Sequence, residues 1–168
     1  MRLLIAVCGS DYDDTQLRDT TLSIAEEVGR WVAKHNATLL CGGRGGVMEA
    51  ACRGAKKEGG VTVGILPSSK EEANPFVDII LPTGIGNLRN FILVKSADAV
   101  IAICGRWGTL NEISLAMELG KPLILIKGTG GVADEIIKHG ILENIESKYH
   151  VVETAEEAVE TALKLITG

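Results

Sequence analysis

Short apolar runs alternate with longer amphipathic segments along most of the chain. Strands that are apolar on both faces are typical of a parallel sheet covered by helices on both sides. The alternation therefore predicts an α/β, Rossmann-like, doubly wound fold with a mainly parallel sheet of about seven strands. The predicted strands are Leu3–Cys8, Thr38–Cys41, Thr62–Leu66, Val77–Leu81, Ala99–Ile103, Pro122–Ile126 and His150–Val152.

Helical periodicity fills most of the intervals between these runs. The last helix opens with Thr154-Ala155-Glu156-Glu157, which has the pattern of a capping box. The segment Pro67–Pro75 predicts no helix and is short for a crossover to a parallel neighbour, so the attachment of the fourth strand stays open. The predicted helices are about Thr21–His35, a segment after Gly46, Leu88–Lys95, Leu110–Leu119, Asp134–Lys138 and Thr154–Leu165.

Two glycine-rich segments each follow a predicted strand, open a predicted helix and carry an arginine. The first is Gly43-Arg44-Gly45-Gly46-Val47-Met48-Glu49, and the second is Gly105-Arg106-Trp107-Gly108-Thr109-Leu110-Asn111-Glu112. Backbone N–H groups are free at such a turn and lie at the positive end of a helix dipole, which favours an anion. Together with Cys8-Gly9-Ser10-Asp11, they predict one site for a phosphorylated small molecule, provided that the first, second and fifth strands are neighbours.

Composition and charge limit the partners of the chain. Its 168 residues and 17.8 kDa predict a single domain over residues 1–168, and 46% hydrophobic residues suffice for a core. The net charge of −5 without a Lys/Arg block argues against a nucleic-acid polymer, whereas a phosphorylated metabolite needs only a local positive pocket.

The apolar runs and the cysteines indicate where the protein resides. The runs fall short of membrane-spanning length, and the N-terminal run Leu3–Val7 is too short for a signal peptide, so we expect no membrane association. Four cysteines without disulfide or C-x-x-C spacing indicate reduced thiols in a cytoplasmic protein, acting as small apolar residues rather than metal ligands.

These motifs resemble the LONELY GUY family, also known as lysine-decarboxylase-like proteins. The family's P-G-G-x-G-T-x-x-E motif is matched at Gly105, Gly108, Thr109 and Glu112, and its preceding arginine is matched by Arg89, nine residues before Asp98. Three further segments are similar to segments of the family: Cys8-Gly9-Ser10, Gly42–Met48 and Gly59–Pro67. The resemblance implies a phosphoribohydrolase that cleaves nucleoside 5′-monophosphates to a free base and ribose 5-phosphate, with Arg89 and Glu112 as its catalytic residues.

The chain also departs from that family pattern. Cys104 replaces the motif's proline, Arg106 replaces a glycine, Asn90 replaces a usual lysine and Glu49 a usual glycine. These departures are similar to a sister branch that includes molybdenum cofactor carrier proteins, which bind a phosphorylated pterin. The resemblance therefore implies a carrier of a nucleotide or molybdopterin-type ligand, with no required cofactor, and hydrolysis is the alternative. A lysine decarboxylase is not expected, because no Schiff-base lysine stands out.

Glu112 and Thr109 have two interpretations. A carboxylate beside a glycosidic carbon stabilises the charge that develops there, which favours a catalytic role for Glu112. Thr109-Leu110-Asn111-Glu112 is equally a capping box in which Thr109 caps the helix. Trp107 stacks on a ligand ring in one interpretation and contacts another protomer in the other.

The resemblance also implies a homodimer that uses the helices carrying Arg89 and Glu112. A third glycine loop, Gly128–Gly131, is interpreted as a simple turn. The candidate ligand-binding residues are Gly9, Ser10, Gly43, Arg44, Gly45, Gly46, Met48, Gly105, Arg106, Gly108 and Thr109.

Overall fold

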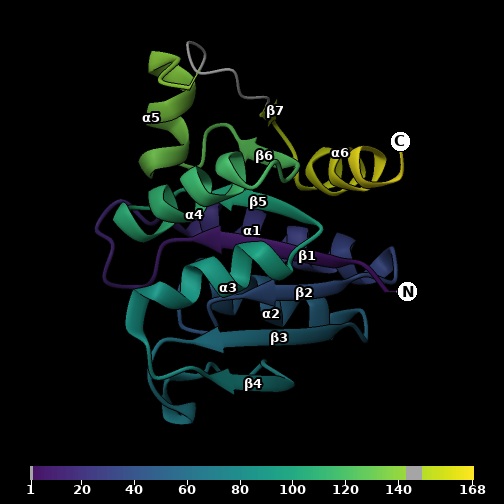
Figure 1. Cartoon of the computed structure of the whole chain (residues 1–168). Helices are drawn as coiled ribbons and strands as arrows, with labels where there is room; N and C mark the ends of the chain where they lie inside the picture. Colours follow the sequence, from purple (N-terminus) through teal and green to yellow (C-terminus); the bar gives the residue numbers. More distant parts are fainter. Residues whose placement is uncertain (1, 143–148) are drawn as a thin grey trace.

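A computed structural model describes residues 2–142 and 149–168 and shows a seven-stranded parallel sheet between two layers of helices (Figure 1). The strand order is β4-β3-β2-β1-β5-β6-β7, and every pairing is parallel. The predicted Rossmann-like α/β fold is confirmed. The strands are β1 (Leu4–Gly9), β2 (Thr38–Cys41), β3 (Val61–Leu66), β4 (Ile79–Pro82), β5 (Ala99–Ile103), β6 (Leu123–Ile126) and β7 (His150–Val152).

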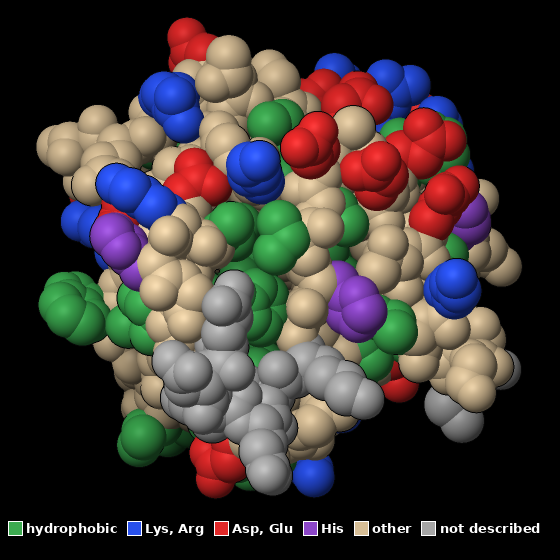
Figure 2. All heavy atoms as spheres, turned by 90° about the horizontal axis from the view of Figure 1, so that it is seen from above, with side chains coloured by type: hydrophobic (Ala, Val, Ile, Leu, Met, Phe, Trp, Pro, Cys, Tyr) green, Lys and Arg blue, Asp and Glu red, His purple; other side chains and the backbone are tan. Residues whose placement is uncertain are grey.

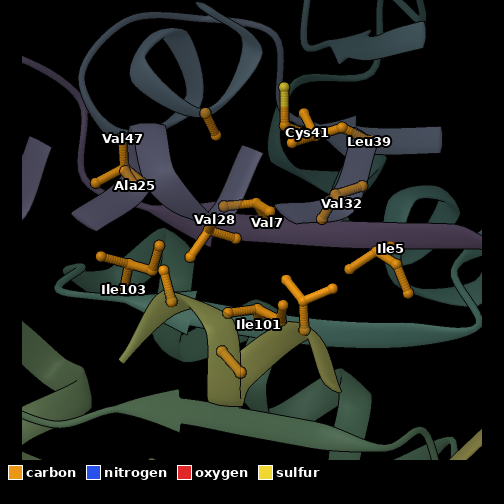
Figure 3. Packing of buried hydrophobic residues seen from close by; sticks show 14 of the residues in the cluster. Ile5, Val7, Ala25, Val28, Val32, Leu39, Cys41, Val47, Ile101 and Ile103 are labelled. Atoms are coloured by element: carbon orange, nitrogen blue, oxygen red, sulfur yellow. The ribbon is translucent and has the colours of Figure 1, made fainter. Parts of the chain in front are cut away.

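The helices cover both faces of the sheet. One core lies under α1, α2 and α6, and the other lies under α3, α4 and α5. Figure 3 shows the first core, where Val28 of α1 lies close to Val7 of β1 and Ile101 of β5. The helices are α1 (Asp19–Lys34), α2 (Val47–Lys57), α3 (Arg89–Ser96), α4 (Trp107–Glu118), α5 (Gly131–His139) and α6 (Ala155–Thr167), with short 3-10 turns η1 (Lys70–Glu72) and η2 (Gly86–Leu88).

The first, second and fifth strands are neighbours in the sheet, as a single site between their loops requires. Strand β1 lies between β2 and β5, with Val7 paired to Cys41 and to Ile101. The strand order reverses at β1, so the loops after β2, β1 and β5 emerge side by side at the carboxyl edge.

Strand β4, whose attachment the sequence left open, pairs with β3 in parallel at the edge of the sheet. The connection spans residues 67–78 and contains only η1, so the interpretation of Pro67–Pro75 as wholly non-helical is wrong by this one turn. A parallel crossover needs a length of about a dozen residues rather than an α-helix as such. The strand begins at Ile79 rather than Val77, because Asp78 instead accepts a hydrogen bond from the Thr62 N–H.

The capping box predicted at the start of the last helix is confirmed. Thr154 Oγ1 accepts a hydrogen bond from the Glu157 N–H, and the Glu157 carboxylate accepts one from the Thr154 N–H. None of the described helices is long and apolar enough to cross a membrane. On the face seen from above, several Asp and Glu side chains lie together on one side, with Lys and Arg side chains at the edge of this group and elsewhere on the face (Figure 2).

Candidate functional site

A cavity of about 210 Å³ opens where the loops after β2, β1 and β5 meet the starts of α3 and α4. Nine of the predicted site residues line this cavity: Gly9, Ser10, Arg44, Met48, Arg89, Arg106, Gly108, Thr109 and Glu112. The remaining lining residues are Val7, Cys8, Asp11, Asp13, Gly42, Asn87 and Asn90. The three loops that the sequence singled out therefore surround one space.

Four predicted site glycines, Gly43, Gly45, Gly46 and Gly105, are not among the lining residues. A Cβ at Gly46 would lie 2.2 Å from the Ser10 carbonyl oxygen, and one at Gly105 would lie 2.3 Å from Thr109 Cβ. Gly46 and Gly105 also have positive φ values of 62° and 99°, which favour glycine. Gly46 therefore lets the loop after β2 approach the loop after β1, and Gly105 makes room for Thr109 of α4.

Ser10 fixes the loop after β1 to the second glycine turn. Its hydroxyl donates to Asp14 Oδ2 at 2.5 Å and accepts a hydrogen bond from the Gly105 N–H at 2.9 Å. Ser10 thus lines the cavity while its hydroxyl is engaged in holding two loops together, an arrangement that the sequence pattern did not indicate.

Helix α4 begins two residues before Thr109, so the capping-box interpretation of Thr109 and Glu112 is wrong. The N-cap position is Arg106, which makes no side-chain capping hydrogen bond. Cys104 (φ 57°) and Gly105 turn the chain immediately after β5, and the helix therefore starts earlier than the apolar pattern from Leu110 predicted. Both Thr109 and Glu112 are buried and line the cavity.

The guanidinium of Arg89 is buried at the cavity, and two of its nitrogen atoms make no hydrogen bond to the described residues. Arg89 is the first residue of α3 and is only 7% exposed, and its Nε and Nη1 have no hydrogen-bond partner among the described residues. A Cβ at Gly42 would lie 2.2 Å from Nη1, so the glycine makes room for this group. A buried charge without hydrogen bonds costs on the order of several kcal/mol, so the site favours a ligand that brings acceptor atoms.

Glu112 faces the same cavity from α4 and is 6% exposed. Burial raises the pKa of Glu112 to about 7, although the Arg89 charge and a hydrogen bond from the Cys8 thiol both act to lower it. Burial and the neighbouring Glu112 raise the pKa of Cys8 well above its usual range, which keeps it a neutral thiol. At neutral pH Glu112 is present both as the acid and as the carboxylate, so it can take up or release a proton.

The two arginines of the glycine turns form ion pairs with the loop after β1. Arg106 Nη2 lies 2.5 Å from Asp13 Oδ1, and Arg44 Nε lies 3.3 Å from Asp11 Oδ2. The hydrogen bond from Arg106 lowers the pKa of Asp13. The predicted cationic residues are thus partly neutralised by carboxylates.

Sequence reasoning missed Asp13 and Asn87 as cavity residues. A cluster of aspartates directly after the first strand was the available signal for Asp13, whereas no pattern marked Asn87. Trp107, for which ring stacking was one interpretation, is 83% exposed and is not among the lining residues.

Comparison with known families decides the relationship of the chain. The model of the SLOG cluster4 family matches residues 2–161. This chain belongs to the SLOG cluster4 family.

Several relatives of this SLOG cluster4 protein are known. It is 39% identical over 160 residues to an uncharacterized protein of Archaeoglobus fulgidus, covering 95% of this chain and 94% of the relative. It is 32% identical over 119 residues to the cytokinin riboside 5′-monophosphate phosphoribohydrolase of Mycobacterium tuberculosis, covering 65% and 64% of the two chains.

Solved structures give the same relationship for the SLOG cluster4 protein. The molybdenum cofactor binding protein of Rippkaea orientalis superposes with a TM-score of 0.88 at 36% identity, covering 99% of this chain and 98% of that one. The molybdenum cofactor carrier protein of Chlamydomonas reinhardtii superposes with a TM-score of 0.87 at 31% identity, covering both chains fully. The predicted resemblance to the LONELY GUY superfamily, in the branch of the carrier proteins, is confirmed.

Proposed function

We propose that this SLOG cluster4 protein binds and carries a phosphorylated, nucleotide-like small molecule of the molybdenum cofactor type. The buried guanidinium of Arg89 supports this most directly, because its Nε and Nη1 lie at the cavity without a partner among the described residues. The start of α4 beside it offers backbone N–H groups and a helix dipole to a phosphate. Solved structures of molybdenum cofactor binding and carrier proteins share the whole fold at more than 30% identity.

The size and polarity of the cavity agree with this proposal. A space of about 210 Å³ accepts one end of such a ligand, and the rest extends through the mouth past Arg44 and Arg106. Phosphate oxygens would compete with Asp11 and Asp13 for these two arginines, which lie half-exposed at the surface.

The test is a loading experiment. The protein and its Arg89→Gln variant are purified from a host that makes molybdopterin, and the released small molecules are analysed for phosphate, molybdenum and pterin fluorescence. We expect bound ligand in the parent protein and in a Lys95→Gln control, which changes an exposed cation on the same helix, and little in Arg89→Gln. Equal loading of all three folded proteins would contradict the proposal, as would a parent protein without a phosphorylated ligand.

A phosphoribohydrolase is the second candidate function, and Glu112 is the observation that favours it. A buried carboxyl with a pKa of about 7 suits proton transfer at neutral pH, and the Mycobacterium tuberculosis relative is named for this reaction. Incubation with nucleoside 5′-monophosphates, scored for free base and ribose 5-phosphate, tests it. Base release that disappears in Glu112→Ala would establish hydrolysis, and no release from any substrate by folded protein would exclude it for that panel.

A further inference from the structure

The cavity carries a paired set of donors and acceptors at its buried end. Arg89 comes from the start of α3 and Glu112 from α4, and the positive charge of Arg89 acts to lower the pKa of Glu112. Their sequence neighbours join the two helices, since Asn90 Nδ2 donates a hydrogen bond to Asn111 Oδ1 at 2.9 Å. This bond fixes the start of α3 against α4 and so holds Arg89 and Glu112 in a constant relation.

The charged residues around the cavity balance one another. Three arginines and three carboxyl groups line it: Arg44, Arg89, Arg106, Asp11, Asp13 and Glu112. A ligand that offers only negative charge would place a further anion beside Glu112, to which the Cys8 thiol already donates a hydrogen bond, and would bring no second donor to its carboxyl group. A better-matched ligand brings acceptors for Arg89 and hydrogen-bond donors for Glu112 on one rigid edge.

We propose that Arg89 and Glu112 together recognise the edge of a 2-amino-4-oxo pyrimidine ring, as found in guanine and in pterins. The guanidinium of Arg89 would donate to the carbonyl oxygen of such a ring, and in guanine a second N–H could also reach N7 of the fused five-membered ring. A carboxylate accepts hydrogen bonds from the neighbouring ring N–H and amino group. This inference rests on the proposed function and specifies the ring of the ligand.

The phosphate would then lie at the start of α4, one helical turn before Glu112. Gly108 and Glu112 are four residues apart on α4, which separates them by about 6 Å along the axis and places them on one face. That separation accommodates a sugar-sized linker between a phosphate at the glycine turn and a ring at Glu112. One ligand can therefore use both ends of the site.

The ring chemistry gives an ordered prediction. Adenine presents an amino group where guanine has its carbonyl oxygen, so it would direct a donor at the donors of Arg89. Hypoxanthine keeps the carbonyl and lacks only the 2-amino group, so it loses a hydrogen bond to Glu112. Three nucleotides with identical ribose and phosphate thus separate ring recognition from phosphate binding.

The experiment measures dissociation constants of GMP, IMP and AMP by titration calorimetry, with chromatography to verify that each nucleotide stays intact. We expect GMP to bind roughly tenfold more tightly than IMP and AMP more weakly still. Glu112→Gln should abolish the advantage of GMP over IMP and leave AMP little changed, while Glu118→Gln, an exposed glutamate of α4, keeps the parent order. Melting curves verify that both variants fold.

Equal affinities for the three nucleotides, or tightest binding of AMP, would overturn the ring proposal. Absence of GMP binding at millimolar concentration would also overturn it. Nucleotides that bind equally but are displaced by inorganic phosphate would leave the phosphate proposal standing, so the two failures are distinguishable. Hydrolysis of all three at similar rates would replace ring recognition by the enzymatic function.

Discussion

Replacing Gly108 by alanine should separate ligand binding from folding, because the change should stabilise the folded protein and weaken the binding of the ligand. Gly108 is the second residue of α4, lines the cavity and has no positive φ. A Cβ built there would meet no protein atom within 4 Å. The protein itself thus tolerates a methyl group at this position, and only a ligand at the start of the helix would meet it.

The magnitudes follow from helix propensity and hydrogen bonding. Alanine in place of glycine stabilises a helix by up to about 1 kcal/mol, and a position in the first turn should give about half of that. In a domain of this size the melting temperature should rise by about 1–2 °C. A methyl group that keeps a phosphate from one charge-assisted N–H contact should weaken binding by about 2 kcal/mol, or roughly 30-fold.

The assay combines a thermal melt without ligand and a calorimetric titration with GMP. Ser114→Ala is the matched control, since it places alanine at an exposed position of the same helix, away from the cavity. Both variants should melt at or slightly above the parent temperature, and only Gly108→Ala should lose affinity. Unchanged binding by Gly108→Ala would refute the assignment of the phosphate to the start of α4.

Three further predictions concern pH, retention and assembly. Glu112 has a raised pKa of about 7 in the folded protein, so its contribution to stability is fully present below about pH 4.5 and is lost as the pH rises through 7. The free energy of unfolding, measured in melts from pH 5 to 8, should therefore decline, and Glu112→Gln should reduce this decline by roughly 3 kcal/mol. A decline of the same size in Glu112→Gln would contradict a buried acid at this position. Arg106→Gly should raise the ligand dissociation rate several-fold in stopped-flow measurements, because Arg106 lies at the mouth paired with Asp13, and an unchanged rate would contradict this role. Phe91→Glu should convert a homodimer to a monomer in light scattering, since Phe91 is an exposed aromatic residue of α3 beside exposed Leu88, and a parent protein that is already monomeric would refute assembly.

The sequence predicted the order of elements and the meeting of three loops, because both depend on local patterns. Parallel strands that are apolar on both faces are visible as continuous runs, and glycine turns are visible by composition. The start of α4 was not visible, since it depends on the left-handed backbone of Cys104, which no residue pattern indicates. The pairing of Arg106 with Asp13 was also beyond the sequence, because it joins residues that are far apart in the chain.

The glycines show a second limit of motif reasoning. A glycine-rich turn predicts close backbone approach, but the sequence does not say what approaches. At Gly46 the neighbour is the Ser10 carbonyl of the protein itself, whereas at Gly108 the space is open. The same residue type thus holds loops together at one position and leaves room at the cavity at another, and only the fold distinguishes the two.

Hydrolysis and ring recognition place opposite demands on Glu112. A hydrolytic carboxylate must face the glycosidic carbon and a water molecule, so its oxygens cannot also accept hydrogen bonds from the ring edge. The charge balance of the cavity favours recognition, because a phosphate alone would place a further anion next to Glu112. A carrier also gains from this arrangement, since a carboxyl engaged with the ring does not activate water against the bound ligand. The order of affinities for GMP, IMP and AMP therefore bears on the reaction as well as on the ligand.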